Sequence, residues 1–131
     1  MSDKKVALFG WHPDVVNYDK WPGMSAEKLR AALEGDRDNL VSLGYDVVLH
    51  YIRDGETAFE TATKALEGQG YDCVLIGAGV RRDEDHFLVF ERLVNAAHMA
   101  APDAAICFNT NPSDTAEAIQ TLDLMLALFL A

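Results

Sequence analysis

The sequence predicts an α/β fold in which helices cover both faces of a parallel sheet. Two observations lead to this fold class. Four short runs of apolar residues alternate with longer segments whose apolar residues recur at helical spacing. The short runs are apolar without alternation, which is typical of strands buried on both faces. Right-handed crossovers then give a three-layer, doubly wound sheet of about four strands in the order 2-1-3-4.

The first strand is expected at residues 6–9 and is ended by Gly10. The helix that follows begins near Ser25. It is stopped by Gly44, because glycine readily adopts the left-handed conformation that closes a helix. Its predicted buried stripe consists of Leu29, Leu33, Leu40 and Leu43.

The second strand is expected at residues 47–51 and the third at residues 73–76. Between them, Thr57 and Glu60 have the spacing of a capping box, so they are expected to open a second helix. That helix ends at Gly68 or Gly70, at the glycines that precede the third strand.

The third helix is expected to begin in the acidic turn at residues 83–85, since carboxylates favour the positive end of the helix dipole. Pro102 ends it, and the fourth strand is residues 105–108. Ser113 or Asp114 is the expected cap of a C-terminal helix. No fifth strand is predicted, and one domain spans residues 1–131. The inward residues of the third helix are predicted to be Phe87, Phe90, Val94 and Ala97.

The composition favours a globular cytoplasmic protein that avoids polyanions. Half of the 131 residues are hydrophobic and the formal net charge is −10, so nucleic acid and anionic membrane surfaces are repelled. Cys73 and Cys107 lie inside apolar runs, as expected of buried thiols in a reducing compartment. The longest apolar run, residues 124–131, is less than half of the ~20 residues that a membrane span needs. No signal peptide is recognisable, and no membrane or nucleic-acid partner is predicted.

Ligands of open α/β sheets bind beyond the carboxyl ends of the strands, beside the point where the strand order reverses. Residues 10–24, 77–86 and 109–115 are expected to meet there. The first of these segments is long for a connection between a strand and a helix, and it contains Trp11 and Trp21. It either forms a lid over a ligand or anchors itself to the sheet edge through the two indoles, and the sequence leaves both open.

Two arginines mark the second segment as a candidate anion site. Gly77 and Gly79 would let the backbone approach a ligand closely, and Arg81 and Arg82 follow in an otherwise acidic chain. Guanidinium groups bind carboxylate or phosphate in a bidentate manner. The alternative is that both pair with the acidic residues 83–85 on a solvated face. Arg82 stands where a dinucleotide-binding fingerprint has its third glycine, so no cofactor is predicted.

Histidines and short polar side chains complete the candidate site. His12 beside Asp14 is the candidate acid/base pair, because a carboxylate can tune an imidazole near neutral pH. Histidines and acids at irregular spacing do not match a metal site, and no motif identifies a nucleophile, so neither a metal nor a reaction is predicted. The predicted ligand-binding residues are Trp11, His12, Gly79, Arg81, Arg82, His86, Asn109 and Thr110.

Across its length, the alternation of strands and helices resembles the flavodoxin-like superfold, a Rossmann-like arrangement shared by flavodoxins and response-regulator receiver domains. A receiver domain has an acidic pair after its first strand and an aspartate after its third, where this chain has Gly10-Trp11 and Gly77. Residues 71–79 and 107–117 are similar to segments of small uncharacterised bacterial proteins of this superfold. The resemblance implies a fold and a bacterial origin, and brings no activity with it.

The C-terminal helix is apolar around its circumference and carries no charge after Asp123. A helix that packs one face on a sheet needs apolar residues at about three positions in seven. We expect a second copy of the chain to cover the surplus, by helix packing across a two-fold axis or by exchange of the last helix. The alternatives are a frayed end or a groove of the same chain. The predicted contact residues are Leu122, Met125, Leu126 and Phe129.

Two functional hypotheses follow. In the first, the chain binds a small anionic ligand at the carboxyl end of the sheet, with residues 11–21 as a lid. In the second, it is a non-catalytic homodimeric regulatory or interaction module on a receiver-like scaffold that lacks phosphorelay residues. A pocket between the loops after strands one and three, lined by His12 and an arginine, would favour the first. The first fails if both arginines point into solvent or pair with residues 83–85 and no cavity lies between those loops.

Overall fold

The structure is a computed structural model, which describes residues 4–130, the last two of them through their backbone alone. The described residues form one parallel sheet with the strand order β2-β1-β3-β4. The order reverses between β1 and β3, which confirms the predicted topology. The strands are β1 (Lys5–Trp11), β2 (Asp46–Ile52), β3 (Cys73–Ile76) and β4 (Ala105–Phe108).

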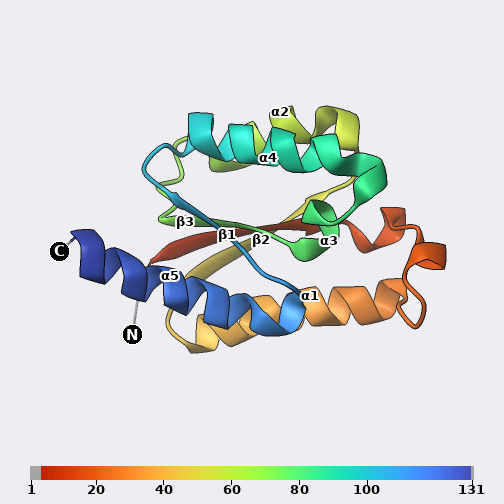
Figure 1. Ribbon diagram of the computed structural model, residues 1–131, viewed down its shortest axis with the longest axis horizontal. Coiled ribbons are helices and arrows are strands. Elements are labelled where there is room, and N and C mark those ends of the chain that lie inside the picture. Colours follow the sequence, from red (N-terminus) through yellow and green to blue (C-terminus); the bar gives the residue numbers. More distant parts are fainter. Residues whose placement is uncertain (1–3, 131) are drawn as a thin grey trace.

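Helices cover both faces of this sheet, so the fold has three layers (Figure 1). One face is covered by α1 (Ala26–Ser42) and α5 (Thr115–Leu130), and the other by α2 (Ala58–Leu66) and α4 (Phe87–Ala100). A single turn of helix, α3 (Ala78–Arg81), follows β3 and is absent from the sequence prediction. None of the helices within residues 4–130 combines the length and the apolar character that a membrane span requires.

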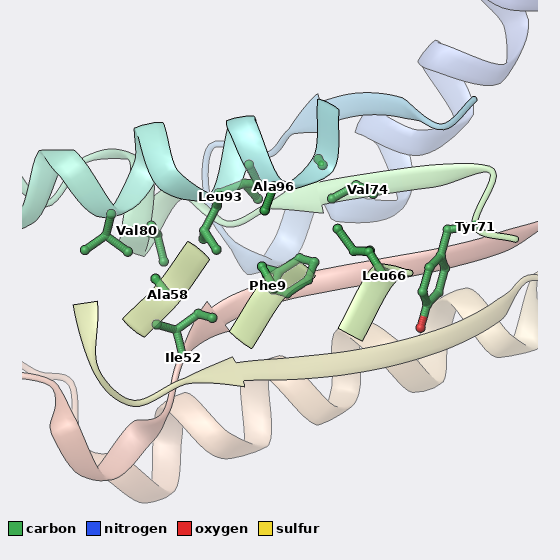
Figure 2. Packing of buried hydrophobic residues seen from close by; sticks show 14 residues of the cluster. Phe9, Ile52, Ala58, Leu66, Tyr71, Val74, Val80, Leu93 and Ala96 are labelled. Atoms are coloured by element: carbon green, nitrogen blue, oxygen red, sulfur yellow. The ribbon is translucent and has the colours of Figure 1, made fainter. Parts of the chain in front are cut away.

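The central strand β1 buries side chains on both faces of the sheet. Ala7 and Phe9 pack on the side of α2 and α4, where Figure 2 shows Phe9 in the same apolar layer as Leu93. Val6 and Leu8 pack on the side of α1 and α5. This two-sided burial is the reason why the strand appears in the sequence as an uninterrupted apolar run.

Two helix caps differ from the predicted ones. Thr57 makes no capping bond, and Asp54 instead accepts a hydrogen bond from the backbone N–H two residues on, at 2.9 Å. Asn111, rather than Ser113 or Asp114, is the cap ahead of α5, with Asp114 as its reciprocal partner in a capping box. In both places a 3₁₀ turn precedes the α-helix. The first unpaired N–H groups therefore lie earlier in the chain than the apolar pattern suggests.

The inward face of α4 is rotated from the predicted one. Phe87 was expected inside, but 62% of its surface is exposed, and Phe90 and Val94 lie at the margin of the core. The helix packs against α2 as well as against the sheet, so its buried direction turns toward α2. Of the predicted residues only Ala97 is fully buried. The observed buried stripe is Val89, Leu93, Ala96 and Ala97.

A polar clamp sets the rotation of α5 about its own axis. Asp123 accepts hydrogen bonds from Lys4 Nζ at 2.9 Å and from the Tyr45 hydroxyl at 2.7 Å. Burial, together with the bond to Asp123, raises the pKa of Tyr45 to about 12, so the phenol stays a donor. The clamp therefore holds the Asp123 side of the helix against the starts of β1 and β2.

The four α5 residues predicted to contact a second copy do not share one environment. Leu122 packs on the core of its own chain and Leu126 is half-buried, whereas Met125 is 47% exposed. Leu122 and Leu126 lie on the same side of α5, because residues four positions apart share one face of a helix. The side chain of Phe129 lies outside the described residues.

A substitution at Gly55 tests how closely the β2–α2 connection packs against α4. A Cβ atom at this position would lie 2.7 Å from Cγ2 of Val89, a buried and conformationally stiff side chain. We expect Gly55→Ala to lower the free energy of unfolding in urea by about 1–3 kcal/mol. Gly35→Ala is the control, because nothing lies within 4 Å of its added Cβ, and should stabilise α1 by about 0.5–1 kcal/mol. Equal stability of the two variants would contradict the close approach.

Candidate functional site

The three segments expected at the carboxyl edge of the sheet do meet, and they enclose a cleft of about 270 Å³. We call it the apolar cleft. It lies between the first loop, the start of α1, the turn α3 and the residues that follow β4. Its rim carries Arg82, Thr110 and Asn111. Its apolar walls include Trp11, Val16, Trp21, Met24, Leu29 and Leu33.

A second cleft, of about 240 Å³, adjoins the first, and we call it the polar cleft. Trp11, Val16 and Trp21 line both clefts, so the first loop forms their shared wall. The remaining polar lining comes from the loops after β1 and β2 and from the turn before α4. It includes Asn17, Lys20, Arg53, Asp54, Asp83 and His86.

The first loop is braced by short-range hydrogen bonds. His12 and Asn17 each cap a 3₁₀ turn, and the Tyr18 hydroxyl donates to the carbonyl of Pro13. The Lys20 ammonium then pairs with Asp85 of the turn before α4. The loop is therefore anchored through polar contacts and forms the shared wall of both clefts. Its role as a lid stays a prediction.

His12 lies outside both clefts. It is buried, its Nδ1 accepts the N–H of Asp14 at 3.0 Å, and its Nε2 lies 2.9 Å from Nη2 of Arg53. Asp14 is exposed and contacts Arg30 at 3.3 Å. Both neighbours of the His12 ring are donors and a neutral imidazole has a single acceptor nitrogen, so only one of these contacts is a hydrogen bond in either tautomer. In both tautomers His12 faces Arg53 and the Asp14 N–H, and it lines neither cleft.

The two adjacent arginines have different surroundings. Arg81 donates from Nη2 to the carbonyl of Asn109 at 2.9 Å and lines neither cleft. The Arg82 side chain is exposed at the rim of the apolar cleft, and its guanidinium makes no hydrogen bond or ion pair within residues 4–130. Neither arginine pairs with the acidic turn. There, Lys20 and His86 hold Asp83 instead.

A buried hydrogen-bond relay supports the floor of the apolar cleft. The Asn109 side chain accepts the N–H of Ala78 at 2.8 Å and donates to the Thr115 hydroxyl at 2.7 Å. The Thr115 hydroxyl in turn donates to Asp36 in α1. The direction of the relay is set at its start, because a backbone N–H can only donate. It therefore ties the end of β4 to α3, α5 and α1.

Burial shifts the acidity of the last member of this relay. The pKa of Asp36 is raised to about 6, chiefly because burial disfavours the carboxylate, while the Thr115 hydrogen bond acts in the opposite direction. The sequence prediction named Asn109 but missed Thr115 and Asp36. A signal for Asp36 exists, since it occupies the position of the apolar α1 stripe between Leu33 and Leu40.

The polar residues that follow β4 mostly serve the turn itself. Thr110 donates its hydroxyl and its N–H to Asp114, which holds the pKa of that carboxyl below its usual value. Of the predicted ligand-binding residues, His12 and Arg81 line neither cleft, and His86 lines only the polar one. Those brought together at the apolar cleft are Trp11, Gly79, Arg82, Asn109 and Thr110.

The cysteines lie away from both clefts and are buried, as predicted. Their sulfurs are 3.3 Å apart, on β3 and β4, and the hydrogen bond to Cys107 together with burial raises the pKa of the Cys73 thiol. A raised thiol pKa disfavours the reactive thiolate. Within residues 4–130, no three His, Cys, Asp or Glu side chains form a group that could hold a metal ion.

No protein-family model matches this sequence, and no curated protein resembles it at a significant level. The function is therefore inferred from the residues of the two clefts and from their surroundings.

We expect the raised pKa of Asp36 to appear as a pH-dependent stability. A carboxyl whose pKa is higher in the folded than in the unfolded protein stabilises the fold at pH values below the unfolded pKa of 3.8. This stability is lost as the pH rises through about 6. The unfolding free energy of the wild type relative to Asp36→Asn should therefore fall by about 1 kcal/mol between pH 4 and 7, a figure reduced for partial exposure. Asp38→Asn controls for a lost α1 carboxylate. Parallel pH profiles for wild type and Asp36→Asn would contradict the assignment.

Asn109→Asp tests the direction of the relay. A carboxylate at this position still accepts the N–H of Ala78 but cannot donate to Thr115, and it places a second negative charge near Asp36. We expect a loss of about 1–3 kcal/mol in urea unfolding at neutral pH. Asn111→Asp is the matched control, since aspartate is an equally good helix cap at that exposed position. Equal losses in the two variants would count against the relay.

Proposed function

We propose that this chain binds a small molecule that carries a flat apolar group and one anionic group, and that the apolar cleft is the binding site. One observation supports it above the others. The guanidinium of Arg82 stands at the rim of an apolar cleft without a hydrogen bond or ion pair inside the described part of the chain. The cleft also has an arginine in its wall, which favours ligand binding over the regulatory-module hypothesis, but it lacks the His12 that the sequence prediction placed there.

The walls of the cleft favour an apolar, planar body. Trp11 and Trp21 offer indole surfaces, and Leu29 and Leu33 of α1 add aliphatic surface. Each Å² of apolar surface removed from water is worth about 25 cal/mol, so ring surface supplies most of the binding energy in such a site. A volume of about 270 Å³ is at the lower end of small-molecule sites, which favours a compact ligand.

The charges around the cleft favour a single anionic group over a polyphosphate. Lys20 is held by Asp83 and Asp85, and Arg81 donates to a backbone carbonyl, so Arg82 is the cation at the rim that remains open to a ligand. A chain with a net charge of −10 also repels highly charged anions at long range. A carboxylate or a phosphate monoester on an aromatic or aliphatic body fits these conditions.

The proposed function is ligand binding. The catalytic role predicted for His12 and Asp14 stays a prediction. We also infer a cytoplasmic location, because an acidic globular chain with two buried thiols suits a reducing compartment.

A thermal-shift screen with matched probes tests the proposed function. Aromatic acids such as benzoate and indole-3-acetate should raise the melting temperature more than their amides, because an amide cannot form the charged bond to Arg82. In Arg82→Gln the acid should lose about tenfold in affinity while the amide is unchanged. Lys64→Gln, an equal charge change on α2 outside both clefts, should keep the preference for acids.

A second variant tests the location of the ligand. Gly79 lines the apolar cleft, and nothing lies within 4 Å of a Cβ added there, so Gly79→Leu should fold normally and obstruct the cleft. Gly35→Leu places the same side chain at an equally open position elsewhere. Loss of acid binding in Gly79→Leu but not in Gly35→Leu supports the site. The proposal is overturned if no acid stabilises the wild type, or if both glycine variants bind equally well.

A further inference from the structure

Most of the exposed large hydrophobic residues of this protein belong to the elements beside one edge of the sheet. Among the described residues, eleven large hydrophobic side chains are exposed, and seven of them belong to α4, β4 and α5. Three others belong to the first loop and one to α1. Figure 1 looks onto this side, with α4 above and α5 below the crossing strand β4. We call it the β4 face.

The strand at the centre of the β4 face has an unpaired backbone edge. β4 pairs with β3 alone among the described strands, and the Ala105 N–H donates to Asp72 across that ladder. Hydrogen-bonding groups alternate in direction along a strand, so the N–H and C=O groups of Ile106 and Phe108 point away from β3. Monomeric proteins protect such an edge with lysine, proline or a bulge, and residues 104–108 contain no lysine or proline.

The other edge of the sheet differs. No residue of β2 after Asp46 is exposed, and α1, which covers one of its faces, has a single large exposed hydrophobic residue, Val41. On β4, in contrast, Phe108 is 41% exposed, and its ring packs edge-on against Phe90 of α4 at 5.5 Å. Of the described residues in the two edge strands, Phe108 is therefore the only large hydrophobic one that is exposed.

We propose that the β4 face binds a second copy of this chain, with the two β4 strands paired antiparallel about a two-fold axis. A two-fold axis normal to the sheet, lying between the two strands at the level of Cys107, sets Ile106 opposite the partner's Phe108, and each copy then satisfies the free groups of the other. Because this axis is normal to the sheet, each helical layer stays on the same side of the sheet in both copies. The α4 helix then lies next to α4 of the second copy, and α5 next to its α5. The two sheets become one continuous sheet.

The choice of a second copy follows from two properties of the face. The edge is self-complementary, because the residues with free donors and acceptors are spaced symmetrically about Cys107. It is also free of charge from residue 104 to residue 108 in a chain whose net charge is −10, so two copies can meet there with the least repulsion. Exposed Met125 on α5 lies beside Leu122 at helical spacing and extends the apolar surface.

Sedimentation of the full chain from about 1 to 200 μM tests the proposal. The expected result is a species of twice 14.4 kDa, whose association strengthens with added salt because the like net charges are screened. Phe108→Glu places two carboxylates close together at the paired edge and should weaken association at least tenfold. Val41→Glu makes the same change at an exposed apolar residue of α1 and should not. Circular dichroism of both variants checks that the monomer is folded.

Amide hydrogen exchange at low and high concentration separates this dimer from one made by helices alone. The amides of Ile106 and Phe108 should become protected as the dimer forms, and should stay unprotected in Phe108→Glu. A monomer at 200 μM overturns the proposal. So does a dimer in which these two amides exchange freely, as helix packing would give, or a dimer that survives Phe108→Glu, as exchange of α5 would give.

Discussion

The amide of Asn109 is the interaction on which the carboxyl edge of this sheet depends. A primary amide can accept and donate at once, and here it accepts the N–H of Ala78 and donates to the buried hydroxyl of Thr115. The Asn109 carbonyl also receives Arg81. One residue at the end of β4 therefore joins α3 to α5, and it satisfies the Ala78 N–H, whose burial without a partner would cost about 1–3 kcal/mol.

This relay ends on a carboxylate placed within an apolar stripe. Asp36 gives Thr115 an acceptor, but its burial works against its own charge, which is why its pKa is raised. The burial of the Asp36 carboxylate in α1 is thus unfavourable, but the relay that ends on it holds α1, α3, α5 and the end of β4 in a defined arrangement at the floor of the cleft. Protein structures often place such polar networks where a defined geometry matters more than stability.

The same edge shows how adjacent residues acquire different roles. α3 is a single helical turn, and consecutive side chains on a helix point about 100° apart. Arg81 is consequently directed to the Asn109 carbonyl and Arg82 to the rim of the apolar cleft. Trp11, which ends β1, separates this cleft from the polar one, so a single strand end defines one wall of each.

The sequence by itself determined the fold class, the four strands, their order and the three segments that meet at the carboxyl edge. It could do so because two-sided burial and helical spacing are local patterns that survive in any packing. Only the tertiary structure decided which candidate residues reach a cleft: His12 lies against Arg53, and Arg81 is held by Asn109, while Arg82 stays open. Those outcomes depend on 3₁₀ turns, on the single turn of α3 and on contacts between segments distant in sequence. None of these leaves a periodic pattern in the chain.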